Sequence, residues 1–397
     1  MRPSPFLLLC ATGLFAIFSS TISKSPVLPM FATYLGADPS GVGLIAAVSA
    51  FAGVVFSIPA GMVSDRIGKR KMLLISSFIF GTAPFLYLFV STIWQLAVVR
   101  FYHGFATAIF IPVAMAMVSE LFHIERGEKM GWFSTSTLIG RFMAPVAGGS
   151  IIGLMTFDPG VGYKAVYIAC GAAGAATFGL ALLLPGTADP KIDGRTWSET
   201  FRAFRSVISD RTILVTCAVE AAILFAYGTF ETFLPLYSMS IGLSPFEVGF
   251  FLSAQVITLA LSKPVMGRFS DRHGRRPQIF AGALIGAVCI GCFSIFRTFL
   301  PMLAMSIGFG LSLSIVTSAT SAYIADLSSR KARGSAMGLL GSIMDIGHTT
   351  GPIVSGFAAA YFGYPKAFMA AAFVLVVFAL IFSSSVKGKM DTEGGFI

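Results

Sequence analysis

The chain has 397 residues, of which 55% are hydrophobic and 12% are charged, and its formal net charge at pH 7 is +10. An average soluble domain carries about 25% charged residues, so the composition excludes a soluble enzyme, a disordered chain and a disulfide-stapled secreted domain. The basic residues fall in alternate short segments and not in one patch, which argues against a nucleic-acid partner and indicates membrane topology.

Twelve apolar runs follow one another along the chain, bounded by charges and turn residues. Each run is long enough for a membrane helix of about 20 residues. The runs cover residues 5–34, 40–64, 71–91, 93–122, 129–156, 162–185, 212–239, 245–269, 276–297, 299–327, 334–361 and 364–386. We therefore predict an all-α integral membrane protein with twelve transmembrane helices.

The loops predict the orientation of these helices. Lysine and arginine gather on one side, for example at 66–71, 191–211 and 268–276, whereas the other side holds only Lys164, Arg297 and Lys366. Loops rich in lysine and arginine stay in the cytoplasm, so both termini are predicted to be cytoplasmic. The short loops and tails indicate a bacterial inner membrane.

The second half of the chain repeats the first. The segment GMVSDRIGKR at 61–70 returns as GRFSDRHGRR at 267–276, and Pro29 returns as Pro235, both at an offset of 206. IGRFMAPVAGG at 139–149 returns as IGHTTGPIVSG at 346–356. Because each half holds an even number of helices, the repeats are parallel and related by an axis along the membrane normal.

The repeat predicts two six-helix bundles, at residues 1–185 and 212–390, followed by a tail at 391–397. Between the bundles, residues 186–211 form the long polar connection. Its apolar residues share one helical stripe and are Trp197, Phe201, Phe204 and Ile208. We predict an amphipathic helix on the cytoplasmic membrane surface; the alternative is a disordered tether.

The two repeated loops resemble the signature loop of the major facilitator superfamily, and the resemblance covers essentially the whole chain. Its residues here are Gly61, Asp65, Arg66, Gly68 and Arg70, and in the second copy Gly267, Asp271, Arg272, Gly274 and Arg275. The resemblance implies that Asp65 faces the start of the eleventh helix and Asp271 the start of the fifth, as latches that close the cytoplasmic side. The alternative is that these loops only set the topology.

Three further motifs resemble the drug:proton antiporters with twelve helices. Pro26 and Pro29 match a proline pair in the first helix, and LAVVRFYHGFATA matches an Arg-x-x-Gln-Gly motif with His103 in place of Gln. GRFMAPVAGG matches the antiporter motif of the fifth helix, with Ala144 in place of Gly. The resemblance implies that Arg100 is a buried arginine tied to proton transfer.

Ionisable residues inside membrane helices are costly unless paired, so each is a functional candidate. The offset places Lys24 opposite Phe230, one residue from Glu231, so we expect Lys24 and Glu231 to meet across the central cavity. The pair is either a proton-coupling element or a static gate.

Further charged residues lie near mid-membrane. Arg141 and His348 are related by an offset of 207, and Asp345 precedes His348 by one turn. Asp345 and His348 either hold a proton together or Asp345 only neutralises a nearby cation.

Two other sets of charges are assigned structural roles. Glu220 and Lys263 lie at similar depth and are predicted to pair, whereas Glu120 and Asp326 are predicted to be latch partners near basic loops.

Aromatic residues on the cavity helices could also contact a substrate. Those selected are Phe18, Tyr34, Phe105, Tyr227 and Phe230. The alternative for each is a packing or lipid-facing role, because the chain has 39 phenylalanines.

The sequence has no Walker loop and no metal-ligand motif, so we expect no enzyme, metal site or bound cofactor, and a proton gradient as the driving force. Lys24, Arg100 and Arg141 make the cavity cationic, which favours a neutral or anionic small-molecule substrate. We predict a monomer in the lipid bilayer that exports an amphipathic compound by proton-coupled alternating access. An organic-anion carrier and a non-transporting sensor are the alternatives.

Overall fold

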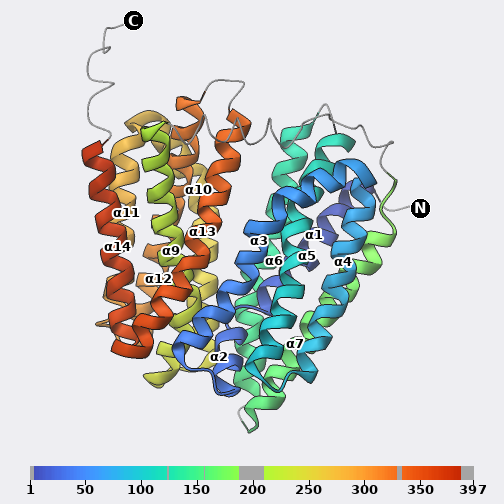
Figure 1. The fold of residues 1–397 in the computed structure, drawn as a ribbon, viewed down its shortest axis with the longest axis horizontal. Coiled ribbons are helices and arrows are strands. Elements are labelled where there is room, and N and C mark those ends of the chain that lie inside the picture. Colours follow the sequence, from blue (N-terminus) through green and yellow to red (C-terminus); the bar gives the residue numbers. More distant parts are fainter. Residues whose placement is uncertain (1–3, 123–124, 156, 187–209, 329–332, 386–397) are drawn as a thin grey trace, which may run out of the picture.

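The computed structural model describes residues 4–122, 125–155, 157–186, 210–328 and 333–385, and their regular structure is entirely helical. The first bundle holds α1 (Pro5–Ile22), α2 (Val27–Tyr34), α3 (Pro39–Ile67), α4 (Lys69–Leu86), the 3-10 turn η1 (Tyr87–Phe89), α5 (Ile93–Leu121), α6 (Arg126–Leu154) and α7 (Pro159–Leu182). The second bundle holds α9 (Arg211–Ser240), α10 (Pro245–His273), α11 (Arg275–Cys292), α12 (Phe299–Leu327), α13 (Arg333–Phe362) and α14 (Tyr364–Ser385). The two bundles stand side by side (Figure 1).

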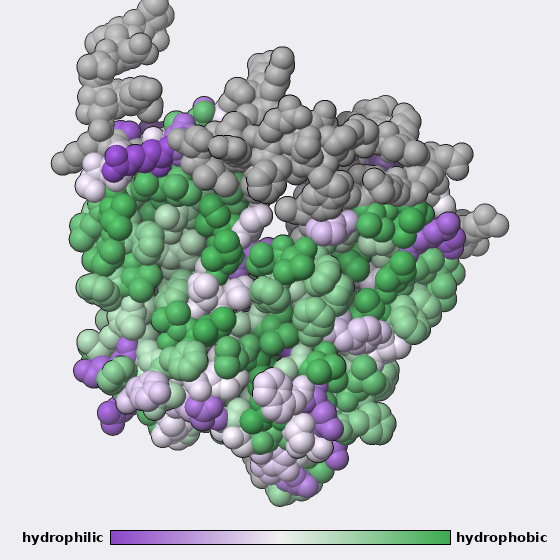
Figure 2. Space-filling view, viewed as in Figure 1, coloured by the Kyte–Doolittle hydropathy of each residue, from purple (hydrophilic) through white to green (hydrophobic). Residues whose placement is uncertain are grey.

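The chain is a multi-pass membrane protein. Ten stretches of helix, with α1 and α2 counted as one, are long and apolar enough to cross a membrane. The two long helices outside this set are α11, which opens with Arg275 and Arg276, and α13, which carries Asp345 and His348. A broad apolar belt separates more hydrophilic residues at the two ends of the helices (Figure 2). The predicted surface helix between the bundles, over 196–208, lies outside the described residues.

The first predicted run is not one continuous helix. α1 ends at Ile22 and α2 begins at Val27, so Lys24 lies in a break of the helix. The Ser25 amide still donates to the Thr21 carbonyl at 2.8 Å. In the second bundle α9 continues through Pro235 without a break. The two halves of the repeat therefore differ in backbone structure at the position of Lys24.

Glycines allow helices of the two bundles to touch backbone to backbone. A Cβ atom on Gly43 of α3 would lie 2.1 Å from the carbonyl oxygen of Pro352 in α13. A Cβ atom on Gly249 of α10 would lie 2.5 Å from the carbonyl oxygen of Pro145 in α6. The same repeat relates Gly43 to Gly249 and Pro145 to Pro352, so the α3–α13 and α6–α10 contacts are equivalent. We call them the two glycine seams.

The seams close one side of the molecule. They lie toward the beginnings of α3 and α10, on the side away from the first and last described residues, Ser4 and Ser385. On the side that holds these two residues, the terminal side, the bundles diverge (Figure 1) and a gap separates them in the space-filling view (Figure 2). The structure is thus a conformation open on the terminal side.

Candidate functional site

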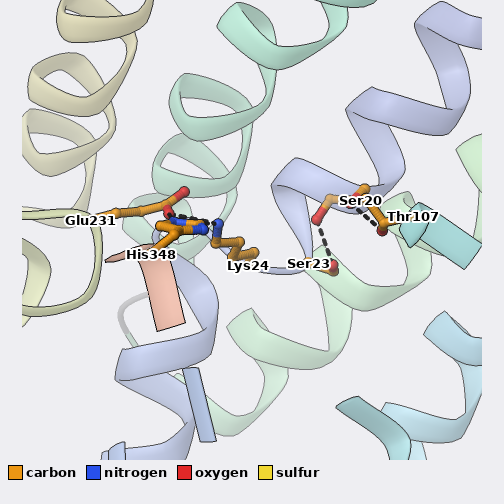
Figure 3. A network of polar contacts seen from close by, with 6 residues as sticks. All are labelled: Ser20, Ser23, Lys24, Thr107, Glu231 and His348. Carbon is orange, nitrogen blue, oxygen red and sulfur yellow. Dashed lines mark hydrogen bonds and ion pairs between the residues drawn. The ribbon is translucent and has the colours of Figure 1, made fainter. Parts of the chain in front are cut away.

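Three ionisable side chains from both bundles meet between the seams (Figure 3). The Lys24 Nζ atom lies 2.6 Å from Glu231 Oε2 and 3.4 Å from His348 Nε2. His348 Nε2 lies 3.2 Å from the same Glu231 oxygen. The expected meeting of Lys24 and Glu231 is confirmed, and His348 joins it as a third member.

The second bundle holds Glu231 and His348 in place. Glu231 lies in α9 and its side chain is only 8% exposed, whereas the side chains of Lys24 and His348 are 27% and 21% exposed. Tyr227, one turn before Glu231, stacks on the His348 ring at a centroid distance of 5.3 Å. The position of Glu231 is therefore fixed by its burial and by the stacked ring beside it, and Lys24 contributes the more exposed partner.

The three residues line a central cavity of about 330 Å³ between the bundles. Its walls also carry Arg100, Arg141 and Asp345, so all six residues expected to bind substrate or couple protons lie around one space. Ser20 and Thr107 add hydroxyl groups to the lining on the first bundle and are 3.1 Å apart. The buried Ser23 hydroxyl donates to the Ser20 carbonyl at 2.8 Å (Figure 3).

Of the two alternatives for Asp345, a pair with His348 is not formed in this conformation. The ring of His348 contacts Glu231 and Lys24 instead, because these two charged groups lie within hydrogen-bond distance of its Nε2 atom. The Asp345 carboxylate is directed toward α3, where its Oδ2 atom lies 4.0 Å from the place of a Cβ atom on Gly53. Asp345 is thus a separate acidic group of the cavity.

Of the five aromatic residues expected at the cavity, only Tyr227 lines it. Phe230 is fully buried within the second bundle, against Phe293 and Phe309. The others lie within or at the edge of the first bundle: Phe105 packs on Phe56 at 4.2 Å, Tyr34 is 55% exposed beside Tyr163, and Phe18 packs against the core. The expectation was wrong for these four because the apolar pattern of a membrane helix does not distinguish its cavity face from its core face.

Sequence reasoning missed Gln255 of α10. Its side chain is 1% exposed, it lines the cavity, and its amide nitrogen has no hydrogen-bond partner among the described residues. The only signal available in the sequence was a polar side chain inside the apolar run at 245–269.

The charged residues at the terminal side pair within each bundle. Lys69 pairs with Glu120, and the Arg275 Nε atom lies 3.2 Å from Asp326 Oδ2. Both pairs obey the offset of 206, so Glu120 and Asp326 do contact basic loop residues, as expected. They join the start of α4 to the end of α5 and the start of α11 to the end of α12.

The predicted latch between Asp271 and the fifth span is not engaged in this conformation, which is open on the terminal side, and it stays a prediction. Asp271 pairs with Arg275 in its own bundle, and its side chain is 60% exposed. Because the bundles diverge on the terminal side (Figure 1), Asp271 makes no ion pair with α6 among the described residues. The counterpart Asp65 lies outside the side chains that the structure describes.

Glu220 and Lys263 form no ion pair among the described residues, although Lys263 lies near enough to act electrostatically on the Glu220 carboxylate. Glu220 is fully buried and accepts a hydrogen bond from the Thr320 hydroxyl, whereas Lys263 is exposed on α10. Glu220 therefore belongs to the interior of the second bundle and not to the central cavity.

Two helical bundles around a central polar cavity, joined by an ionic cluster, form an arrangement typical of a membrane transporter. The model of the Major Facilitator Superfamily matches residues 8–255 and 225–392, so the chain belongs to this superfamily and is a transporter, not an enzyme.

Its relatives are distant. An uncharacterised MFS-type transporter of Methanocaldococcus jannaschii is 27% identical over 365 residues, covering 90% of this chain and 92% of that protein. The multidrug resistance protein MdtG of Escherichia fergusonii is 23% identical over 384 residues, covering 93% and 91%.

Solved structures share the fold. A bacterial homologue of the human lysosomal transporter Spinster, in an inward-facing and occupied conformation, has a TM-score of 0.79 at 15% identity and covers 96% of this chain and 95% of its own. The nucleoside transporter NupG has a TM-score of 0.79 at 16% identity, covering 98% and 100%. At these identities the likeness is one of fold alone.

Proposed function

We propose that the protein is a secondary active transporter that exports a small amphipathic compound, neutral or anionic, in exchange for protons. The observation that carries the proposal is the cluster of Lys24, Glu231 and His348, which joins the two bundles at the wall of the central cavity. A proton on Glu231 cancels its charge and so weakens its attraction for Lys24. Proton uptake is thereby linked to the contact between bundles that alternating access must break and remake.

The relatives support the direction of transport. The name of the Escherichia fergusonii relative describes multidrug resistance, which agrees with export. We further propose that α11 and α13 also span the membrane, giving twelve spans, and that the terminal side is cytoplasmic in a bacterial inner membrane. The basic residues of the terminal side, such as Lys69 and Arg275, support this orientation. The protein is proposed to act as a monomer, with a proton gradient in place of any cofactor.

A specific observation favours a second candidate, an organic-anion carrier that is not coupled to protons. Three basic side chains line the cavity, those of Lys24, Arg100 and Arg141, against the two acidic side chains of Glu231 and Asp345. Such a lining attracts anions whether or not a proton moves.

Inside-out vesicles from a host stripped of its own exporters separate the two functions. A proton gradient is set with the interior acid, and anionic, neutral and cationic compounds are added in turn. Antiport predicts that one class of compound collapses the gradient with the intact protein and not with Glu231→Gln. An uncoupled carrier moves labelled anion and leaves the gradient unchanged.

The role of the Lys24–Glu231 pair requires a double variant. If the pair is a proton carrier, Glu231→Gln abolishes antiport whether residue 24 is lysine or methionine. If the pair is only a gate, Lys24→Met and Glu231→Gln each lose transport to the same extent and the double variant regains it. Arg297→Gln, which removes an exposed charge that does not line the cavity, is the matched control.

A further inference from the structure

We propose that the transported compound is an organic monoanion, such as a carboxylate, whose anionic group binds between Arg100 of α5 and Gln255 of α10. This inference rests on the proposed transport function and names the substrate class of the same cavity. In this inference Lys24 and Glu231 bind each other and do not contact the substrate.

Arg100 is a buried cation that lacks an acidic partner. Its side chain lies at the cavity wall and is 3% exposed, and its Nε atom has no hydrogen-bond partner among the described residues. None of the ion pairs of the described residues includes it. The groups near it are Tyr87, which hydrogen-bonds its side chain, and His103, Tyr167 and Cys170, and none of them is a carboxylate that could balance its charge. A buried guanidinium is stable only with compensating hydrogen bonds or an anion.

Gln255 supplies a second unused donor from the other bundle. Its side chain is 1% exposed, it lines the same cavity as Arg100, and its Nε2 atom has no partner among the described residues. Buried polar groups almost always have hydrogen-bond partners. Two such groups without partners at one cavity indicate a ligand with acceptor oxygens, and donors in both bundles allow that ligand to bridge them.

The charge of the lining selects a single negative charge. Lys24, Arg100 and Arg141 contribute three positive charges, and Glu231 and Asp345 contribute two negative ones. With His348 neutral, the difference is one positive charge. Because Lys24 and Glu231 neutralise each other at 2.6 Å, a monoanion balances the remaining groups.

The rest of the wall accommodates an apolar body. Leu224, Leu252, Val256 and Pro145 line the cavity beside the polar groups. Its volume of about 330 Å³ lies at the lower end of the range of roughly 300–1,000 Å³ for small-molecule sites. The cavity therefore fits a compact amphipathic anion.

Binding to the purified full-length protein in nanodiscs tests this inference by calorimetry at pH 7. The probes are three matched sets, and each set places a carboxylate, an amide and an amine on the same apolar group. The first set is 4-phenylbutanoate, 4-phenylbutanamide and 4-phenylbutylamine, and the other two carry a naphthyl or a decyl group instead. We expect the carboxylate of at least one frame to bind at least tenfold more tightly than its amide, and the amines not to bind. A lost hydrogen bond to a charged group lowers affinity by about 10- to 100-fold, which is the loss expected for Arg100→Gln and for Gln255→Leu.

Arg100→Lys, which keeps the charge but not the fork of donors, should lose less affinity than Arg100→Gln, and Arg297→Gln should lose none. Gln255→Leu keeps the test valid if the Arg100 variants do not fold. Binding of the amines at equal strength, no binding by any frame, or undiminished carboxylate affinity in both Arg100→Gln and Gln255→Leu would overturn the inference. If the carboxylates bind as expected but release no protons in vesicles, the substrate class stands and the proposed antiport fails.

Discussion

Alanine at Gly43 and Gly249 together perturbs both glycine seams at once. The added Cβ atoms would lie 2.1 Å and 2.5 Å from carbonyl oxygens of the facing helices, where ordinary contact begins at 3.4 Å. Each pair of helices must therefore move apart by about an ångström, and such overpacking costs about 1–3 kcal/mol per site. The cost falls only on the conformation in which the seams are closed. At the lower end, about 2 kcal/mol for both sites, the ratio of the two conformations shifts roughly 30-fold.

Spin labels on the terminal side measure this shift. Trp132 of α6 and Phe269 of α10 are both exposed near that side, and the half-buried Cys10 and Cys292 can be replaced by serine before labelling. We expect the distance between the labels to shorten in the double variant, because opening the seams closes the terminal side.

Gly179→Ala is the matched control for this experiment. A Cβ atom there meets nothing within 4 Å, and Gly179 lies exposed in α7, which takes no part in either seam or in the repeated loops. It reports the gain in helix propensity alone, about 0.5–1 kcal/mol. An unchanged distance distribution in the double variant would refute the assignment of the seams as the closed gate.

Thr320→Val removes the hydrogen bond to the buried carboxylate of Glu220, so the free energy of unfolding should fall by about 1–3 kcal/mol. Thr317→Val should leave thermal unfolding unchanged, since the Thr317 hydroxyl has no partner among the described residues; equal losses in both would contradict this reasoning. Lys69→Gln breaks an ion pair whose acidic side chain is 46% exposed, and a loss above about 1 kcal/mol is not expected. Tyr34→Phe should leave the apparent affinity for substrate unchanged in vesicle transport. A clear change would show that Tyr34 contacts the substrate.

The repeat predicted much of the fold and the centre of the site. Because the offset of 206 places Lys24 beside the counterpart of Glu231, their meeting across the bundles followed from the sequence alone. The same offset related Glu120 to Asp326, and both contact basic residues at the loops. Repetition is informative here because it fixes depth and helix face at the same time.

The remaining features depend on packing that periodicity does not encode. The break after Ile22 lies at Pro26, whose counterpart in the continuous helix α9 is Thr232, whereas Pro29 and its counterpart Pro235 both lie inside helices. Phe230 and Tyr227 lie three residues apart in α9, yet one is fully buried and the other lines the cavity. Gln255 was missed because it carries no charge. Its side-chain amide became a candidate only because the structure shows no hydrogen-bond partner for it among the described residues.

The two glycine seams have a consequence for how this chain can change over time. The seam is present in two matching copies, whereas the residues proposed to bind the substrate, Arg100 and Gln255, have Ser306 and Ser49 at their counterparts in the repeat. The helix contacts that must open and close are thus duplicated, whereas the residues of the substrate site occur once. Substitutions that change the substrate can therefore accumulate at these single residues without disturbing the backbone contacts of the seams. For the same reason, the substrate site can be engineered while the seams are kept.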